Sequence, residues 1–208
     1  MKANNTLLTV LLLTLLPSLG WSTPLDELVE RDGLYYPKFS DVPFTGKVTG
    51  KSQGYLKNGK EQGDWLSYHD NGQLKGRGNY KNGKREGAWI SYWDNGRLMD
   101  EGNYKNGKKE GAWVSYNESG RLMDEGNYKN GKREGVWFVY WVNGKLWYSV
   151  NHKNGKREGA WISYFDNGQL WRKGNYKDGK KEGAWVEYDY HGQLESKGNY
   201  KNGLKISD

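Results

Sequence analysis

Residues 102–113 read Gly-Asn-Tyr-Lys-Asn-Gly-Lys-Lys-Glu-Gly-Ala-Trp, and close copies of this stretch return every 24 residues along the chain. Glycine, tyrosine and leucine keep fixed positions within the period, and so does tryptophan, as Trp65, Trp89, Trp113, Trp137, Trp161 and Trp185. A fixed period of this length is typical of repeat architectures, in which each unit packs mainly on its neighbours. We therefore expect six uninterrupted repeats over about residues 54–203.

Each repeat contains two turn signals, of which Asn106-Gly107 and Asn95-Gly96 are examples. Asn-Gly favours a two-residue type I′ turn because both central residues take a positive φ. Successive turns lie alternately 13 and 11 residues apart, which leaves strands of about nine to eleven residues. The pattern predicts an all-β fold: a single elongated, curved antiparallel meander of about 13 strands, built from tandem 24-residue hairpins.

Two-residue turns at both ends of every strand predict a definite register. They place Trp89 opposite Gly102, Gly102 opposite Gly111, and Trp93 opposite Leu98. In this register the recurring Trp, Gly, Tyr and Leu positions share one face of the sheet. A large ring opposite a glycine can lie flat over the neighbouring backbone, which is the arrangement called aromatic rescue.

The first 22 residues resemble a secretory signal peptide. Lys2 gives a short positive region, Leu7 to Leu16 form an apolar run, and Pro17 ends it. We expect cleavage after Ser22, with Gly20 as the alternative. The apolar run is shorter than the ~20 residues that span a bilayer, so the mature protein is expected to be exported, periplasmic or secreted, and not transmembrane.

The two ends of the mature chain depart from the period. Residues 23–53 contain a degenerate half-repeat, preceded by the net acidic segment 25–43, and they are predicted to form an N-terminal cap. Repeat arrays need such caps to shield their last apolar surface. Residues 204–208 remain for a C-terminal end strand or tail.

Composition and spacing argue against an active site or a metal centre. The 208 residues include no cysteine, which excludes disulfides and thiol chemistry. The three histidines, His69, His152 and His191, occupy positions without metal or triad spacing. Asp100 and Asp124 lie one repeat apart, about 10 Å, which is wide even for a glycosidase pair. We expect no catalytic residue, no metal, no cofactor and no enzyme activity.

The stretch from Gly102 to Trp113 resembles the MORN repeat in its bacterial variant, and the longer pattern with its Asn-Gly-x-Leu turn is similar to the YwqK-family antitoxins. The segments 28–36 and 42–46 are similar to the N-terminal part of exported members. This resemblance implies a repeat scaffold that binds proteins and contacts lipids. The antitoxin label implies neutralisation of a toxin protein by binding it.

Basic residues gather at the Lys-flanked turns, which all fall along one edge of the predicted meander. With a net charge of +7, this edge suits anionic lipid, an acidic envelope polymer or an acidic protein. The alternative is a set of solvated turns that block aggregation, each partly neutralised by the glutamate that follows it. Nucleic acid is not an expected partner. The candidate anion-binding rim consists of Lys84, Arg85, Lys108, Lys109, Lys132, Arg133, Lys156 and Arg157.

Aromatic residues are concentrated around repeat four, where Val150 and His152 replace the usual Gly and Tyr. The predicted register places Tyr140 opposite Trp147 on the more variable face. Trp and Tyr are enriched in interface hot spots. These rings serve either as a partner contact or as extra packing against the N-terminal segment or the curled sheet. The candidate partner-binding residues are Tyr140, Trp141, Trp147 and Trp171.

The sequence thus favours a non-enzymatic exported repeat protein that acts as a protein-binding scaffold in the bacterial envelope. One alternative is an envelope-surface binder that uses the basic rim on anionic lipid or acidic polymer. A further alternative is an antitoxin-like neutraliser of a toxin protein.

Overall fold

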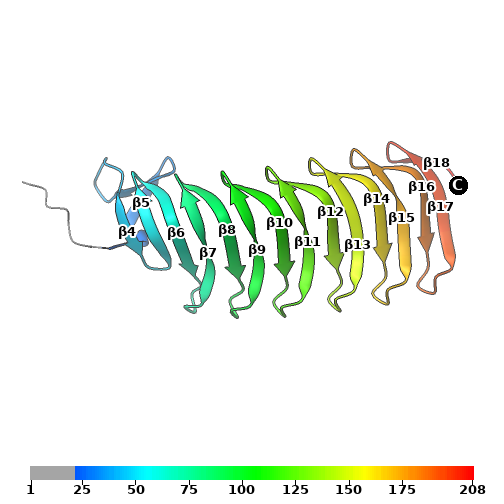
Figure 1. The fold of residues 1–208 in the computed structure, drawn as a ribbon, viewed down its shortest axis with the longest axis horizontal. Helices are drawn as coiled ribbons and strands as arrows, with labels where there is room; N and C mark the ends of the chain where they lie inside the picture. Colours follow the sequence, from blue (N-terminus) through cyan, green and yellow to red (C-terminus); the bar gives the residue numbers. More distant parts are fainter. Residues whose placement is uncertain (1–21) are drawn as a thin grey trace, which may run out of the picture.

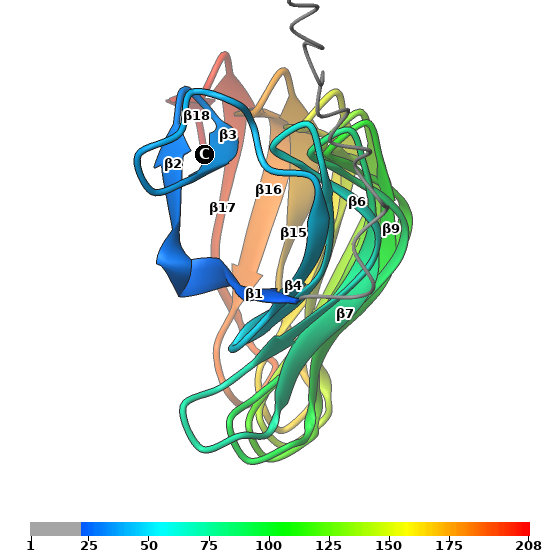
Figure 2. The ribbon, with the colours of Figure 1, turned by 90° about the vertical axis from the view of Figure 1, so that its left-hand side faces the viewer.

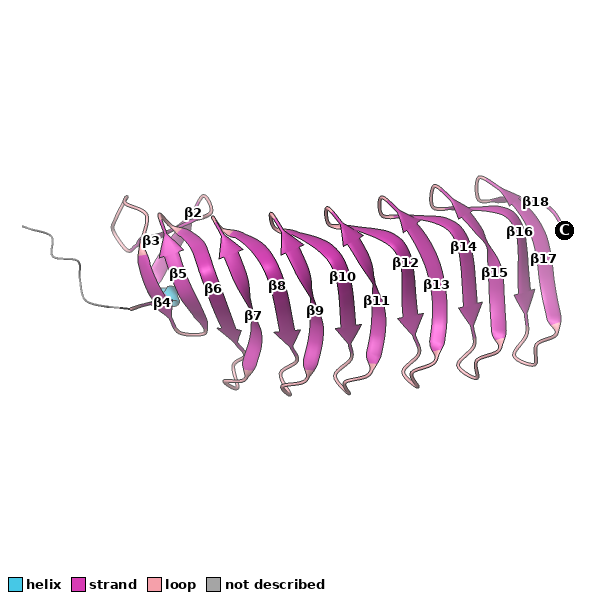
Figure 3. Cartoon of the chain, in the orientation of Figure 1, coloured by secondary structure: helices cyan, strands magenta, loops and turns pink. Residues whose placement is uncertain are grey.

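The computed structural model describes residues 22–208, which form one long sheet and a small hairpin (Figures 1 and 3). The predicted all-β meander is confirmed: neighbouring strands from β4 onward pair in chain order, in a sheet of 16 strands. The sheet begins with β1 (Thr23–Pro24), which pairs in parallel with β4 (Gly46–Thr49). The short 3-10 helix η1 (Leu25–Glu27) leads into the separate hairpin of β2 (Leu28–Arg31) and β3 (Leu34–Pro37).

The remaining strands all pair antiparallel. They are β5 (Ser52–Lys57), β6 (Lys60–Tyr68), β7 (Leu74–Lys81), β8 (Lys84–Tyr92), β9 (Leu98–Lys105), β10 (Lys108–Tyr116), β11 (Leu122–Lys129), β12 (Lys132–Tyr140), β13 (Leu146–Lys153), β14 (Lys156–Tyr164), β15 (Leu170–Lys177), β16 (Lys180–Tyr188), β17 (Leu194–Lys201) and β18 (Leu204–Ser207). From β6 to β17 the strands have nine and eight residues in alternation, shorter than predicted because one of the two turns is longer than expected.

The turns at the two edges of the sheet differ in kind. The Lys-flanked turns are the predicted two-residue type I′ turns, with φ of 51° at Asn106 and 79° at Gly107. At the other edge the prediction is wrong, because five residues connect β8 to β9. In this loop the Trp93 N–H donates to the Arg97 carbonyl at 2.8 Å, and the Asn95 side chain accepts the Arg97 N–H at 3.0 Å. The Asn side chain thus stabilises a wider loop instead of a positive φ at its own position.

The wider loop shifts the register at that edge. Trp89 pairs with Gly102 as predicted, but Leu98 pairs with Tyr92 instead of Trp93. A one-residue bulge separates these two pairs, and a shift of one residue moves a side chain to the other face. The recurring leucine therefore lies on the face opposite Trp89, not on the face predicted for it.

A second bulge lies within the strand that carries the tryptophan. Gly111 has a φ of 72°, which favours glycine, and the pairing jumps between Glu110 and Trp113. Gly102 therefore pairs with Trp113, and the predicted pairing with Gly111 is wrong. Gly111 serves as the bulge residue, and the bulge places Trp113 opposite Gly102.

The sheet is curved, with the N-terminal segment on its hollow side (Figure 2). The recurring tryptophans lie on this concave face, because that segment packs against Trp65. Trp113 lies over Gly102, where an added Cβ would come within 2.4 Å of the ring, so the predicted aromatic rescue is present. Its indole N–H donates to the Asn103 carbonyl at 3.1 Å. Its edge-to-face contact with Tyr104, at a centroid distance of 5.2 Å, continues a ladder of alternating Tyr and Trp rings.

The segment before the repeats packs on the concave face at the N-terminal end. The β2–β3 hairpin lies on the hollow side of the sheet (Figure 2). Its Tyr35 N–H donates to the Gly59 carbonyl at 2.9 Å. Side chains of this segment pack on a core that contains Val48 and Leu56, both fully buried. The packing residues are Leu25, Leu28, Tyr35 and Phe44.

Candidate binding face

A cation lies over each of the recurring tryptophans from repeat two onward. The Arg85 guanidinium stands 4.3 Å from the Trp89 ring centroid, and the Lys109 Nζ stands 3.7 Å from the Trp113 ring. The same relation holds for Arg133 over Trp137, Arg157 over Trp161 and Lys181 over Trp185, at 4.0 to 4.7 Å. These distances are within cation–π range. The concave face therefore presents rows of aromatic rings and positive charge together.

The predicted basic rim divides into two sets. Arg85, Lys109, Arg133 and Arg157 do not point along the edge but fold over the concave tryptophans. Burial lowers the pKa of Lys109, while the nearby carboxylates of Asp100 and Asp124 act in the opposite direction. The other set makes no such contact with the tryptophan rings and lies exposed along the turns, and it consists of Lys84, Lys108, Lys132 and Lys156.

The glutamate that follows each basic pair has a structural role that sequence reasoning missed. Glu110 accepts the N–H of Asn130, the first turn residue of the next repeat, at 2.7 Å. Gln62 does the same for Asn82 at 2.9 Å. Glu86, Glu134, Glu158 and Glu182 make the equivalent bond. In the sequence, a Glu or Gln stands 20 residues before the first residue of each of these Lys-flanked turns, and this constant spacing is the signal that could have predicted the bond.

The concave face changes where Val150 replaces glycine. Val150 is buried, with 2% of its surface exposed, and its side chain fills the place where the next tryptophan ring would lie. Trp161 instead stacks on Tyr148, with ring centroids 4.5 Å apart and planes 17° apart. His152, two residues on, is also buried, and its Nδ1 has no hydrogen-bond partner.

A cavity of about 290 Å³ opens beside the displaced ring. Trp147 and Trp171 both line it, from corresponding positions of β13 and β15. Trp147 packs on Trp141 with centroids 4.6 Å apart, and Trp171 stacks on Phe165 at 5.3 Å. The other lining residues are Tyr148, Arg157, Trp161, Ser163, Arg172, Tyr176, Lys181 and Trp185.

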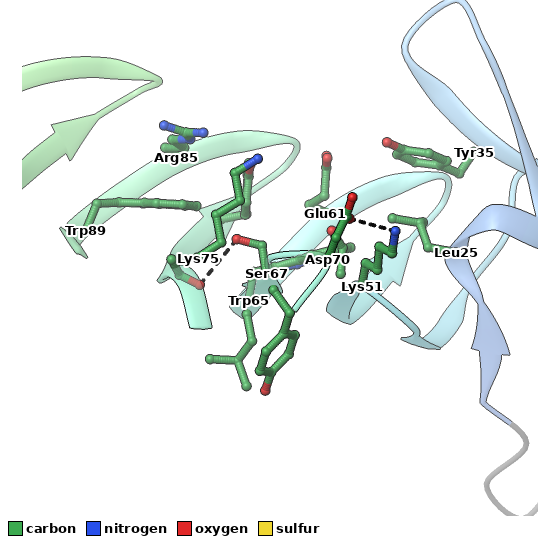
Figure 4. Close-up of a pocket in the computed structure, with 15 residues that line it drawn as sticks. Leu25, Tyr35, Lys51, Glu61, Trp65, Ser67, Asp70, Lys75, Arg85 and Trp89 are labelled. Atoms are coloured by element: carbon green, nitrogen blue, oxygen red, sulfur yellow. Dashed lines mark hydrogen bonds and ion pairs between the residues drawn. The ribbon is translucent and has the colours of Figure 1, made fainter. Parts of the chain in front are cut away.

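A second cavity, of about 480 Å³, lies on the same face beside the N-terminal segment (Figure 4). Leu25 and Tyr35 come from that segment and face Trp65 of the first repeat. Lys51 and Asp70 form an ion pair of 2.8 Å at its border. The segment thus occupies part of the concave face and leaves a hollow next to itself.

Comparison with known families gives a match along the repeats. The MORN repeat variant matches at residues 61–82, 85–106, 109–130, 133–154, 157–178 and 181–202, which is more than half of the chain. The chain belongs to the MORN repeat variant family. A search of the curated proteins found no match.

One of the four predicted contact residues lies apart from the others in this MORN repeat variant sheet. Tyr140 pairs with Leu146, so the predicted pairing with Trp147 is wrong. Its hydroxyl donates to Glu125 at 2.6 Å on the convex face. Burial and this hydrogen bond raise the pKa of Tyr140 to about 12.

Trp141 has a structural contact as well as a place beside the cavity. Its indole N–H donates to the Tyr164 carbonyl of the next MORN repeat at 3.0 Å, as the Trp93 indole does to Tyr116. The structure therefore brings Trp141, Trp147 and Trp171 together. They do not contact the N-terminal segment, which packs on the first repeats.

The expected signal peptide lies outside the described residues, apart from Ser22. Between residues 22 and 208, no three His, Cys, Asp or Glu side chains gather as a metal site would require. Over the same range, no helix has the length and apolar composition needed to cross a membrane. His69 contacts the Tyr92 carbonyl at 2.9 Å, which is a bond between neighbouring repeats.

Proposed function

We propose that this MORN repeat variant protein is a non-enzymatic binding scaffold that holds a partner protein on its concave face. The observation that carries the proposal is the row of tryptophans with Arg or Lys above each ring, from Trp89 to Trp185. Trp, Tyr and Arg are the residues most enriched in interface hot spots. The N-terminal segment supports the proposal further, because a polypeptide already packs on this face at the first repeats.

The proposed site of action is the bacterial envelope. The composition of residues 1–22 supports export, because a basic start, an apolar run and small residues follow in the order of a signal peptide. A binding role without catalysis is supported by how charged groups are used. Lys109 and Arg133 cover rings, and Arg172 pairs with Glu187.

An affinity pull-down from the host envelope tests this function. The bait is the wild-type chain, and the matched control is Trp147→Ala/Trp171→Ala, with circular dichroism to verify its fold. We expect a protein that wild type retains and the variant loses. Recovery of the same proteins by both baits would contradict binding through these rings.

Anionic lipid or acidic polymer is the second candidate partner, and the exposed turn lysines favour it. Lys84, Lys108, Lys132 and Lys156 lie in a row, one every two strands, or about 10 Å. Binding by such a row fades as salt screens it. Flotation with anionic vesicles at low and high ionic strength tests it, and a result that salt does not change would contradict it.

A toxin protein is a special case of the first candidate, suggested by the resemblance to YwqK-family antitoxins. An antitoxin-like role requires that the retained protein be harmful on its own. Expression of that protein with and without this chain tests the role, and equal growth in both cultures would exclude it.

A further inference from the structure

The cavity around Trp147 and Trp171 differs from the equivalent hollow at the first repeats, where Lys51 and Lys75 hold the positions of these two tryptophans. In repeat three, the Trp113 ring lies over Gly102 and leaves no room for a side chain on that glycine. At Val150 the ring cannot lie over the strand, so Trp161 stands against Tyr148. An equivalent hollow lies at the first repeats, where Trp65 does lie over Gly54, so the aromatic lining and not the hollow itself is particular to repeats four to six.

Positive charge surrounds this hollow. Arg157 stands 4.7 Å from the Trp161 ring, Arg172 stands 4.3 Å from the Trp171 ring, and Lys181 completes the lining. No carboxylate is among the residues that line the hollow, and the nearby Glu187 is already paired with Arg172. Cations already cover the ring faces, so the charges and ring edges are what a ligand meets.

The chain carries its own example of an occupant for such a surface. Residues 23–45 contain five acidic and two basic residues, and they place Leu25, Leu28 and Tyr35 on the first repeat. The Arg85 guanidinium stands at the border of the hollow beside that segment. An acidic polypeptide with apolar side chains is therefore the chemistry that this concave face accommodates.

We propose that the cavity lined by Trp147, Trp161 and Trp171 binds an acidic segment of a partner protein, with a leucine or an aromatic side chain in the hollow. The carboxylates of this acidic segment lie against Arg157 and Lys181. This inference rests on the proposed binding function and locates it on repeats four to six. Electrostatic complementarity of this kind governs the choice of partner and the association rate.

A random 12-residue peptide library displayed on phage tests the site. It is selected on the wild-type chain and counter-selected on Trp147→Ala/Trp171→Ala. A matched control, Val136→Ala/Phe138→Ala, removes exposed apolar side chains from the convex face of the same region. We expect enriched peptides that combine Asp or Glu with Leu, Phe, Tyr or Trp. Their affinity should fall at least tenfold in the Trp147→Ala/Trp171→Ala variant and stay unchanged in the control.

A charge variant keeps the test decisive if the tryptophan variant loses its fold. Arg157→Gln leaves the rings in place, and it should weaken the selected peptides several-fold and reduce their dependence on salt. Peptides without acidic residues, or equal affinity in Arg157→Gln, would overturn the proposal.

Other outcomes separate this site from the broader function. Peptides that bind wild type and both variants equally would overturn the cavity as the site while protein binding elsewhere on the chain remained. Enrichment of no peptide would contradict both. A further outcome is that anionic vesicles or polygalacturonate bind more tightly than the selected peptides and lose this binding in the same variants. That result would assign the cavity to lipid or polymer and overturn the proposal.

Discussion

The indole ring of Trp113 lies so close over Gly102 that a methyl group on Gly102 would come within 2.4 Å of the ring. Gly102→Ala should therefore lower the free energy of unfolding by about 2 kcal/mol, because overpacking forces the ring or the strand to move. Urea unfolding followed by tryptophan fluorescence measures the loss.

Gly198 provides a matched control for that substitution. It holds the same position in the last repeat, but the atom nearest an added methyl is the flexible end of Lys205. Gly198→Ala should lower the free energy of unfolding by only about 1 kcal/mol, the low end of the cost of overpacking, because the end of Lys205 can move aside and the nearest backbone atom, the Ser207 oxygen, lies 3.2 Å away. Equal losses at the two positions would contradict the role assigned to the tryptophan ring.

Glu110 stabilises the turn of the next repeat through a 2.7 Å hydrogen bond from the Asn130 N–H. Glu110→Ala should lower the free energy of unfolding by about 1 kcal/mol, since the amide loses its acceptor. Glu110→Gln should retain most of the stability, because Gln62 makes the same bond in the first repeat. If Gln and Ala cost the same, the carboxylate acts through its charge on the lysines and not as a turn acceptor.

The repeating features of the fold were accessible from the sequence because each depends on one local rule. The period gives the positions of six of the eleven tryptophans, and Asn106-Gly107 forms the predicted type I′ turn. The same dipeptide at Asn95-Gly96 forms a wider loop, because the backbone between Trp93 and Arg97 closes on itself. A dipeptide alone does not distinguish these two outcomes.

The candidate site was only partly predictable, because it depends on contacts between repeats. The sequence indicates Trp147 and Trp171 as candidate contact residues, and they do line one cavity, but on the concave face with Trp161 and not on the variable face that the predicted register gives them. Tyr140 was assigned to them through a register that a bulge near the loop changes. The stacking of Trp161 on Tyr148 in the cavity wall depends on Val150, eleven residues before that ring, and no motif encodes that relation.

Tyr140 provides a negative control for the proposed site. It lies on the convex face, hydrogen-bonded to Glu125, and not in the cavity. Tyr140→Phe should lower the free energy of unfolding by about 1 kcal/mol, the usual worth of such a bond. Peptide affinity should not change, as measured by calorimetry, and a tenfold loss of affinity would place the binding surface on the convex face instead.

His152 should make stability depend on pH. Burial lowers the pKa of His152 below its ordinary value of 6.5, and Arg133 and Arg157 lower it further. Below about pH 6.5 the unfolded chain therefore binds a proton that the folded chain does not, and the free energy of unfolding falls as the pH drops. Urea unfolding at pH 7.5 and pH 5 measures this difference.

The variant His152→Tyr should remove the part of the pH dependence of stability that comes from this histidine. Tyrosine is the usual residue of this position, and Arg85 donates to its counterpart Tyr104 at 3.1 Å, so Arg133 gains a similar partner. We expect higher stability and a smaller change between the two pH values. A pH dependence equal to that of wild type would show that other groups cause it.

Val150→Gly should return Trp161 to the arrangement found in the other repeats. Without the valine side chain, the ring can lie over residue 150, and its indole N–H can donate to the Asn151 carbonyl as Trp137 donates to Asn127 at 3.2 Å. The lost stacking on Tyr148 is then replaced by contact of the Trp161 ring with the strand.

Hydrogen exchange of the Trp161 indole, followed by NMR, checks this prediction without any ligand. A new hydrogen bond under a packed ring should slow the exchange at least tenfold, whereas the Trp113 indole, already bonded to Asn103, serves as the internal reference. Unchanged exchange at Trp161 would mean that Tyr148 holds the ring by itself. The valine would then be a consequence of the displaced ring and not its cause.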